Sequence, residues 1–246
     1  MEDSVTSLLT GIGWVTAGGL GRARTGAGFD MPSGHLPPLS SKEVAGGPCR
    51  RFDRMDTYSQ LGLTAIGLAL KDAGLDRWTE KRPFDIVVST VYGCLATDIE
   101  YFDTVIPQEG LLASPSLFAY TLPSSFLGEA AIHFGLSGAS CIVNEKVPLA
   151  LKCVRMALQS LAWGECATVL AGVCDLECPP PYDGLGTTAS GAAFLVLENT
   201  LREAVSPYGT ILLDGGTDVL FDGTPVQDLP GLIRLCIKSR PAKIPM

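Results

Sequence analysis

Charged residues, histidines and long apolar runs are all scarce in this chain of 246 residues. Only 18% of the residues are Asp, Glu, Lys or Arg, below the usual quarter, and the net charge is −8. A protein that binds nucleic acid needs a clustered cationic surface, so this charge balance argues against nucleic acid as a partner. No hydrophobic run approaches the roughly 20 residues of a membrane-spanning helix, which argues against a membrane protein.

The start of the chain lacks the lysine-rich segment of a secretory signal peptide, because acidic residues follow Met1 directly. We therefore expect a cytoplasmic protein. The eight cysteines are scattered, and the closest pair, Cys174 and Cys178, has no second pair and no histidine near it. This spacing favours small buried side chains over disulfides or a zinc site, and we expect neither a metal nor a cofactor.

What the chain does contain is typical of an α/β protein: 46% hydrophobic residues and 28 glycines. Apolar runs and helical spacing predict strands at 7–15, 84–91, 140–144, 167–173, 192–198 and 210–214, and helices at 56–73, 95–104, 124–134, 148–163 and 231–239. Residues 115–120 are predicted to be extended or a turn. This alternation predicts a layered α/β fold with a mostly parallel sheet.

Two glycine-containing segments near the start have no such periodicity. Residues 16–48 are rich in Gly, Pro and Ser and predict a long loop. Gly11 and Gly13 precede it, but the third glycine and the following helix of a dinucleotide-binding fingerprint are missing. We interpret this glycine pair as a tight turn.

Two further groups could carry chemistry. Ser124 and Ser125 could form a nucleophile elbow, but no Gly-x-Ser-x-Gly surrounds them, and the start of a helix is the plainer interpretation. Asp175, Glu177 and Asp183 follow a predicted strand end, where α/β sites often form. Three prolines between them favour a stiff loop over a metal or acid–base site.

Six short motifs between residues 51 and 198 carry a family resemblance. They are Arg51-Phe52-Asp53, Thr121-Leu122-Pro123-Ser124, Gly128-Glu129-Ala130-Ala131-Ile132, Gly135-Leu136-Ser137-Gly138-Ala139-Ser140, the run 164–172 and the run 190–198. In order and spacing they resemble the N-terminal half of β-ketoacyl-acyl-carrier-protein synthases, which have a thiolase-like fold. The resemblance covers roughly residues 8–240. It implies a single domain over 1–246, with 16–48 as an excursion and 205–246 as the start of a truncated second half.

For the fold, the resemblance implies a mostly parallel five-stranded sheet in a layered α/β/α arrangement. For the chemistry, it implies a nucleophilic cysteine at the N-terminus of a buried helix, where the helix dipole favours the thiolate. The matching position here is Val147, which has no nucleophile. Glu145, just before the helix, is well placed for the helix dipole, but its carboxylate would oppose a neighbouring thiolate. Cys141, in mid-strand, and Cys153, a turn and a half into the helix, are expected to be core residues.

The family's two catalytic histidines come from a C-terminal half that is not matched here. His35 lies in the long loop, and His133 is expected to be structural. The resemblance therefore implies a non-catalytic protein similar to the chain-length factors, which pair with an active synthase in fatty-acid or polyketide-type synthesis. It also implies a homodimer or a heterodimer with a catalytic synthase. The expected dimer strand consists of Ser140, Cys141, Ile142, Val143 and Asn144.

Other interpretations stay open at this point. A second chain that supplies the missing half could complete an acyltransferase, or the chain could be a decayed product without function. Lys152, Arg155 and Gln159 form a polar stripe on the predicted helix 148–163, which suggests a partly solvated face on a helix that the family buries. The basic cluster of Arg50, Arg51 and Arg54 is either a solvated loop or a docking patch for an acidic acyl carrier protein.

Overall fold

The computed structural model describes residues 6–146, 149, 151–178, 189–203, 205–215 and 217–239. The strands are β1 (Ser7–Thr16), β2 (Gly19–Arg22), β3 (Asp85–Thr90), β4 (Ser140–Asn144), β5 (Thr168–Asp175), β6 (Gly191–Glu198), β7 (Gly209–Asp214), β8 (Asp218–Phe221) and β9 (Thr224–Val226). The α-helices are α1 (Thr57–Asp72), α2 (Leu95–Val105), α3 (Pro115–Phe118), α4 (Ser125–Phe134), α5 (Lys152–Ala162) and α6 (Leu229–Lys238). Short 3₁₀ helices occur at Ala23–Thr25, Phe52–Arg54 and Ile106–Gln108. No described helix is long and apolar enough to cross a membrane.

These strands form one mixed sheet in the order β4-β3-β5-β6-β1-β7-β8-β9, with β2 paired to β1. Only β4, β3 and β5 run parallel, and every other pairing is antiparallel. The prediction of a mostly parallel, five-stranded sheet is therefore wrong. Parallel neighbours require a crossover: helices α2, α3 and α4 lie between β3 and β4 in the chain, and α5 lies between β4 and β5, which pairs with the other side of β3. The hairpins of β7, β8 and β9 need none.

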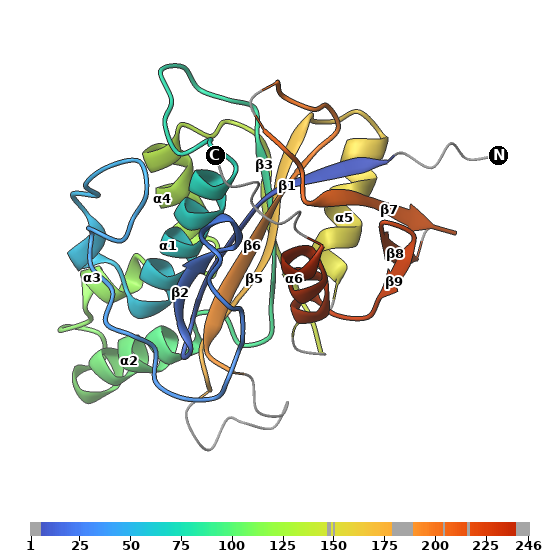
Figure 1. The fold of residues 1–246 in the computed structure, drawn as a ribbon. Coiled ribbons are helices and arrows are strands. Elements are labelled where there is room, and N and C mark those ends of the chain that lie inside the picture. Colours follow the sequence, from blue (N-terminus) through green and yellow to red (C-terminus); the bar gives the residue numbers. More distant parts are fainter. Residues whose placement is uncertain are drawn as a thin grey trace.

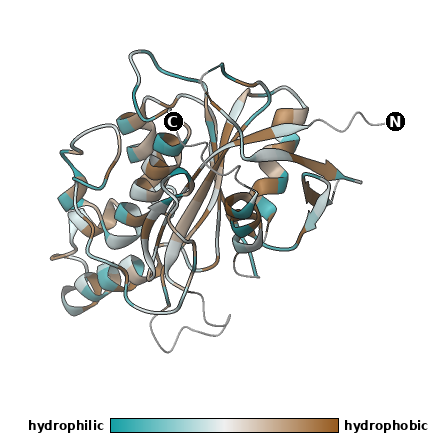
Figure 2. Ribbon diagram, in the orientation of Figure 1, coloured by the Kyte–Doolittle hydropathy of each residue, from teal (hydrophilic) through white to brown (hydrophobic). Residues whose placement is uncertain are grey.

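Helices cover both faces of the sheet, as the layered prediction required (Figure 1). One hydrophobic core lies between the sheet and helices α5 and α6, and a second lies between the sheet and helices α1 and α4. Strand β6 contributes to both cores, because Leu195 faces the first and Phe194 the second, and all eight of its residues are buried. Figure 2 shows this apolar interior as brown strands. A continuous apolar strand is what two covered faces require.

Helix α1 confirms the sequence prediction closely. The Asp56 side chain caps it by accepting a hydrogen bond from the amide of Ser59 at 3.0 Å. The helix lies directly on β1, where Gly11 and Gly13 belong to the strand instead of forming the predicted turn. A side chain on Gly13 would approach the backbone nitrogen of Ala69 to 2.2 Å, so these glycines are needed for close helix–strand contact.

Other local predictions need correction. The excursion 16–48 contains β2 and a 3₁₀ helix, and residues 115–118 form the short helix α3 instead of an extended segment. Strands β8 and β9 were not predicted, because neither of these short segments has a long apolar run. Helix α5 begins at Lys152 and not at residue 148. Leu149 has a φ of 62°, in the left-handed region, which is incompatible with a helix at that point.

Candidate functional site at the edge strand and the start of helix α5

Strand β4 forms one edge of the sheet and pairs with β3 alone among the described strands. The amide of Ile86 donates to the carbonyl of Ala139, and the amide of Glu145 donates to the carbonyl of Thr90. These two bonds fix the phase of the parallel ladder, in which alternate residues face the neighbouring strand. Cys141 and Val143 bond inward to β3, and the backbone groups of Ser140, Ile142 and Asn144 point outward. The strand thus has three residues ready to pair with another strand.

Immediately after β4, Glu145 reaches the first turn of helix α5. Its carboxylate Oε1 accepts a hydrogen bond from the amide of Lys152 at 3.2 Å and another from the Ser89 hydroxyl at 2.5 Å. The Ser89 oxygen in turn accepts the amide hydrogen of Cys153 at 3.2 Å. The first two amides of the helix are therefore connected to one carboxylate, the Lys152 amide directly and the Cys153 amide through the Ser89 hydroxyl. A negative charge is favourable at the positive end of a helix dipole. This agrees with the prediction that Glu145 is well placed for that dipole.

Cys153 lies in the first turn of α5, not a turn and a half into it as expected. It is a core residue, as predicted, with 0% of its surface exposed. Burial, with a smaller contribution from the Glu145 carboxylate, raises the pKa of the Cys153 thiol to about 12. A helix N-terminus usually promotes a thiolate, but here burial and a resident anion keep the sulfur protonated and unreactive.

The end of strand β5 carries a buried carboxylate that fixes a neighbouring turn. Asp175 accepts hydrogen bonds from the amides of Val91, Tyr92 and Gly93 and from the Thr90 hydroxyl, all within 3.1 Å. Burial nevertheless raises the pKa of this carboxyl. Sequence reasoning placed Asp175 correctly at a strand end. It missed this anchoring role, because the partners are backbone amides more than 80 positions away.

Most of the other candidate residues have structural roles or lie apart. His133 contacts the carbonyl of Ala45 through Nε2 at 3.1 Å, as expected for a structural histidine, and His35 lies exposed in the long loop. The Ser125 hydroxyl donates to the carbonyl of Ala119 at the start of α4, in agreement with the helix-start interpretation. Asp183 lies outside the described residues. The cysteines are all free, and the described residues contain no cluster of three metal-ligating side chains.

A family model now places these features in context. The model described as "Beta-ketoacyl synthase, N-terminal domain" matches residues 40–194, which is more than half of the chain. The chain belongs to the β-ketoacyl synthase family. Among curated proteins, the "Putative polyketide beta-ketoacyl synthase 1" of Streptomyces halstedii is 29% identical over 204 residues, covering 70% of this chain and 47% of that protein. The chain thus spans about half the length of this relative.

Solved structures of β-ketoacyl synthases share the fold. "The ishigamide ketosynthase/chain length factor" matches with a TM-score of 0.68 at 19% identity, over 85% of this chain and 62% of that one. "Ketosynthase (ApeO) in Complex with its Chain Length Factor (ApeC) from Xenorhabdus doucetiae" matches with a TM-score of 0.55 at 20% identity, over 78% and 79%. The thiolase-like fold predicted from the sequence is confirmed.

In this member of the β-ketoacyl synthase family, the residue at position 147 is known from the sequence alone. Val147, the residue that matches the family's nucleophile, lies outside the described residues, between Glu145 and the start of α5. The hydrogen bond from the amide of Lys152 to the Glu145 carboxylate joins described residues that precede and follow position 147 in the chain.

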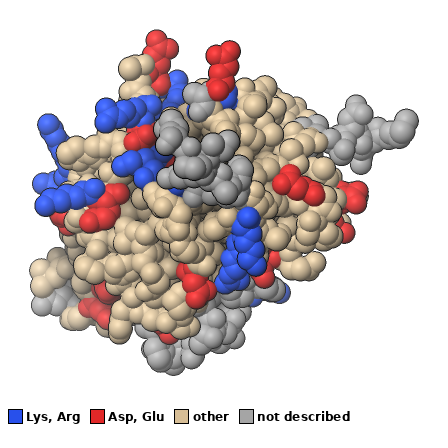
Figure 3. All heavy atoms as spheres, in the orientation of Figure 1, with Lys and Arg blue, Asp and Glu red and all other residues tan. Residues whose placement is uncertain are grey.

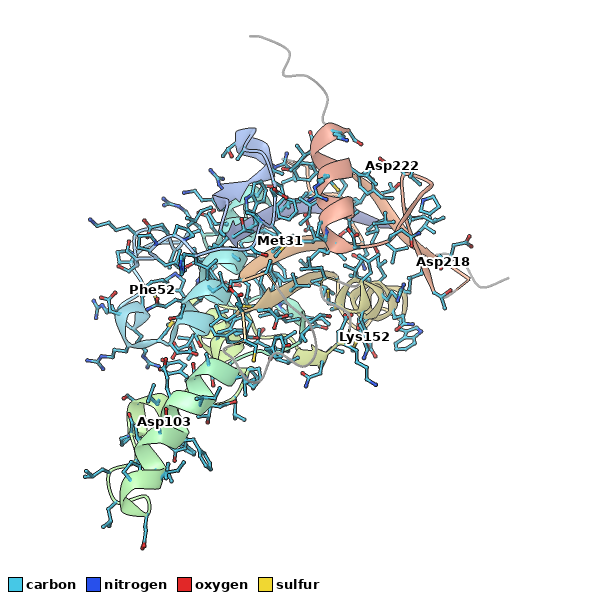
Figure 4. All side chains as sticks on the ribbon, turned by 90° about the horizontal axis from the view of Figure 1, so that it is seen from below. Met31, Phe52, Asp103, Lys152, Asp218 and Asp222 are labelled. Atoms are coloured by element: carbon cyan, nitrogen blue, oxygen red, sulfur yellow. The ribbon has the colours of Figure 1, made fainter. Side chains whose placement is uncertain are left out.

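The outward face of α5 is polar, in agreement with the sequence prediction of a solvated stripe. Lys152 and Arg155 are exposed, and Gln159 is partly buried on the same face. Figure 4 shows the Lys152 side chain pointing away from the body of the protein. The opposite face, with Val154, Leu158 and their apolar neighbours, packs on the sheet. Helix α5 is therefore amphipathic, as a helix at a protein surface should be.

A second unusual surface is the apolar arm, defined here as residues 95–122, which includes α2 and α3. Figure 4 shows this arm, marked by Asp103, projecting beyond the end of the sheet that β4 forms. The exposed large hydrophobic residues of the described chain are concentrated in it: Phe102, Ile106, Leu111, Leu112, Phe118 and Leu122, with Leu111 85% exposed. Clusters of this kind mark interaction surfaces in soluble proteins.

Proposed function

We propose that this chain is a non-catalytic subunit that pairs with a catalytic β-ketoacyl synthase in fatty-acid or polyketide-type synthesis, in the manner of a chain-length factor. The observation that carries the proposal is the combination of a free edge on β4 with an exposed apolar arm that projects past the same edge. A subunit that adds a strand to β4 would also cover the arm. The solved relatives named above include a ketosynthase in complex with its chain-length factor.

The size of the arm's apolar surface supports a partner of protein size. Six large side chains, each exposed by 60% or more, present on the order of 700 Å² of surface. A standard protein–protein interface buries about 800 Å² on each partner. The arm alone therefore supplies most of one side of an interface, and the edge of β4 supplies the directional hydrogen bonds.

Two features support the absence of condensation chemistry. Position 147 holds valine where the resemblance implies a nucleophilic cysteine. Cys153, the thiol in the first turn of α5, is fully buried, and its pKa of about 12 leaves almost no thiolate near neutral pH. Covalent acyl transfer needs a thiolate that is both populated and accessible, and Cys153 is neither.

The alternative is an acyltransferase completed when a second chain supplies a matching half. By resemblance, such a complex would bury helix α5 between two sheets. Lys152 and Arg155 would then lie in an apolar layer, where unpaired charges are strongly unfavourable. The polar outward face of α5 therefore favours the non-catalytic subunit over the completed enzyme.

The proposal also covers an acyl carrier protein as a second partner, and leaves the paired subunit as either a second copy of this chain or a catalytic synthase. Arg50, Arg51 and Arg54 are exposed, and Arg51 lies 3.6 Å from the carboxylate of Glu129, a distance at which a surface ion pair contributes little. These arginines are available to an acidic carrier protein. We propose that the cluster is a docking patch for such a carrier.

The catalytic half of the proposal is tested with an acyl carrier protein that bears a radiolabelled acyl group. After the reaction, denaturing electrophoresis should show no radiolabel on this chain, whereas an active ketosynthase in a parallel reaction should carry label. Covalent label on any residue of this chain would overturn the non-catalytic assignment.

The pairing half is tested by co-expression with a catalytic polyketide ketosynthase. The unmodified chain should co-purify with it, and the double variant Phe102→Glu/Phe118→Glu should not, because charges on the arm prevent apolar contact. The matched control Trp163→Glu/Leu201→Glu changes two exposed hydrophobic residues outside the arm and should co-purify normally. Equal recovery of both variants would contradict a role for the arm.

A further inference from the structure

A hollow on the α1 side of the sheet has no role in the proposed pairing. Two overlapping depressions of about 490 and 580 Å³ share Gly46, Asp76 and Arg77 in their walls. The loop 41–48 forms one wall, and the segment 76–79 forms the other. Gly46 allows the two walls to meet, because a Cβ there would lie 2.7 Å from the carbonyl oxygen of Asp76. The size of the hollow suits a small molecule.

The charge of this hollow is opposite to that of the protein. Lys42, Lys71 and Arg77 line it, and Asp76 is the only acidic residue among the lining residues of the two depressions. None of the three cations takes part in an ion pair with a described carboxylate. Neighbouring Glu43 accepts hydrogen bonds from the amide and hydroxyl of Ser40.

The surrounding sequence has the same bias. Segment 42–82 contains eight Lys and Arg residues against six Asp and Glu, a net charge of +2, whereas the whole chain carries −8. Figure 3 shows Lys and Arg side chains gathered on the side of the molecule where Figure 1 places α1 and the loop before it. An isolated cationic hollow on an acidic protein attracts anions selectively.

An aromatic ring completes one wall. Trp78 is 40% exposed, and its indole nitrogen donates to the carbonyl of His133 at 3.0 Å, which fixes the orientation of the ring. One part of the ring packs against Gly135, where an added Cβ would lie 2.3 Å from Trp78 Cδ2. The remaining surface lines the hollow beside Arg77 and Thr79. A ring held in this way is a ready stacking platform.

We propose that this hollow binds a phosphate-bearing small molecule with an aromatic base, of the nucleoside diphosphate class. Lys42, Lys71 and Arg77 would neutralise the phosphates, and Trp78 would stack on the base. An acidic protein surface is a less suitable occupant. The cations line a depression instead of a flat surface, and Asp76 lies among them and would repel a broad acidic surface. The proposal does not depend on the partner subunit or on acyl chemistry.

The test is calorimetric titration of the full chain with ADP, without divalent metal, at low salt. We expect saturable binding that weakens as salt is raised, competition by inorganic pyrophosphate, and weaker binding of adenosine. The double variant Lys71→Gln/Arg77→Gln should weaken ADP binding by about tenfold or more. The matched control Lys152→Gln/Arg155→Gln removes the same two charges from helix α5, on the other face of the sheet, and should bind ADP as the unmodified chain does.

A third variant tests the ring. Trp78→Leu should weaken ADP by about tenfold and leave pyrophosphate unchanged, because only the base contacts the indole. Absence of measurable heat with millimolar ADP, or equal losses in the two double variants, would overturn the site. Binding of polyglutamate without binding of ADP or pyrophosphate would also overturn it, in favour of a docking surface for an acidic protein.

Discussion

Replacing Ile142 by proline tests the proposed pairing of strand β4 with a strand of a second subunit. The change should have little effect on the fold of the chain itself. The amide of Ile142 points away from β3, since the bonds at Ala139 and Glu145 fix the alternation of the ladder. Proline removes one N–H and restricts φ to a value that edge strands tolerate. The variant therefore keeps every β3–β4 hydrogen bond and loses only the outward donor.

The magnitude can be worked out for a proposed antiparallel pair of two β4 strands centred on Ile142, the middle of the three outward-facing residues. Ile142 would exchange two hydrogen bonds with Ile142 of the partner subunit, and Ser140 and Asn144 would exchange four more with the partner. Proline on both strands removes two of these six bonds and leaves two carbonyl groups unsatisfied. At about 1–2 kcal/mol for each lost bond, association weakens by about 2–4 kcal/mol, or roughly 30- to 1000-fold in Kd. In a heterodimer with one changed strand the loss is about half as large in free energy.

Sedimentation equilibrium measures self-association, and co-purification measures pairing with a catalytic synthase. Ile142→Thr is the matched control, because it keeps both the amide hydrogen and the β-branched side chain and should associate normally. Circular dichroism and urea unfolding should show a folded protein for both variants. If Ile142→Pro folds and associates as tightly as the unmodified chain, β4 is not the pairing strand.

Three further predictions concern stability. Asp72→Ala should lower the free energy of unfolding in urea by about 3–5 kcal/mol, because the buried carboxylate accepts bonds from two backbone amides and the Tyr208 hydroxyl; Tyr208→Phe should cost only about 1 kcal/mol, and equal losses would argue against the network. Glu145→Ala should cost about 1–2 kcal/mol and speed hydrogen exchange in the first turn of α5, whereas Glu145→Gln, which keeps the acceptor oxygen, should change both less. Burial raises the pKa of Cys94 and Cys153 from 9.0 to about 12, so the free energy of unfolding should fall as pH rises from about 9 towards 12. Iodoacetamide at pH 8 should leave both thiols of the native protein unlabelled. Rapid labelling of Cys153 would refute its assignment to the core.

The sequence was sufficient where a local signal dominates. The bounds of helices α1 and α4 and of the apolar strands β3, β5 and β6 depend on neighbouring residues, and each was predicted to within two residues. The thiolase-like fold came from motif order, which reflects the family and not local physics.

Long-range arrangements were not accessible from periodicity. The direction of a strand in the sheet depends on which segments are connected through helices. The sequence pattern of a single apolar strand is the same whether its neighbours are parallel or antiparallel. At the start of α5 the backbone amide of Lys152 donates to the carboxylate of Glu145, seven residues earlier, which follows no helix-cap pattern in the sequence. The cations of the hollow come from two segments, Lys42 from the loop 41–48 and Lys71 and Arg77 from the end of α1 and the residues after it, which only the fold brings together.

The base of the apolar arm has a consequence for how this protein can diverge. Gly93, where the chain leaves the sheet, and Pro123, where it returns, lie so close that a Cβ on Gly93 would be 3.2 Å from the proline ring. Asp175 holds the departing turn in place. A segment that exits and re-enters through one anchored point can grow, shrink or be exchanged while every strand keeps its register. Under the pairing proposed above, the partner preference of residues 95–122 can therefore change without refolding the rest of the molecule.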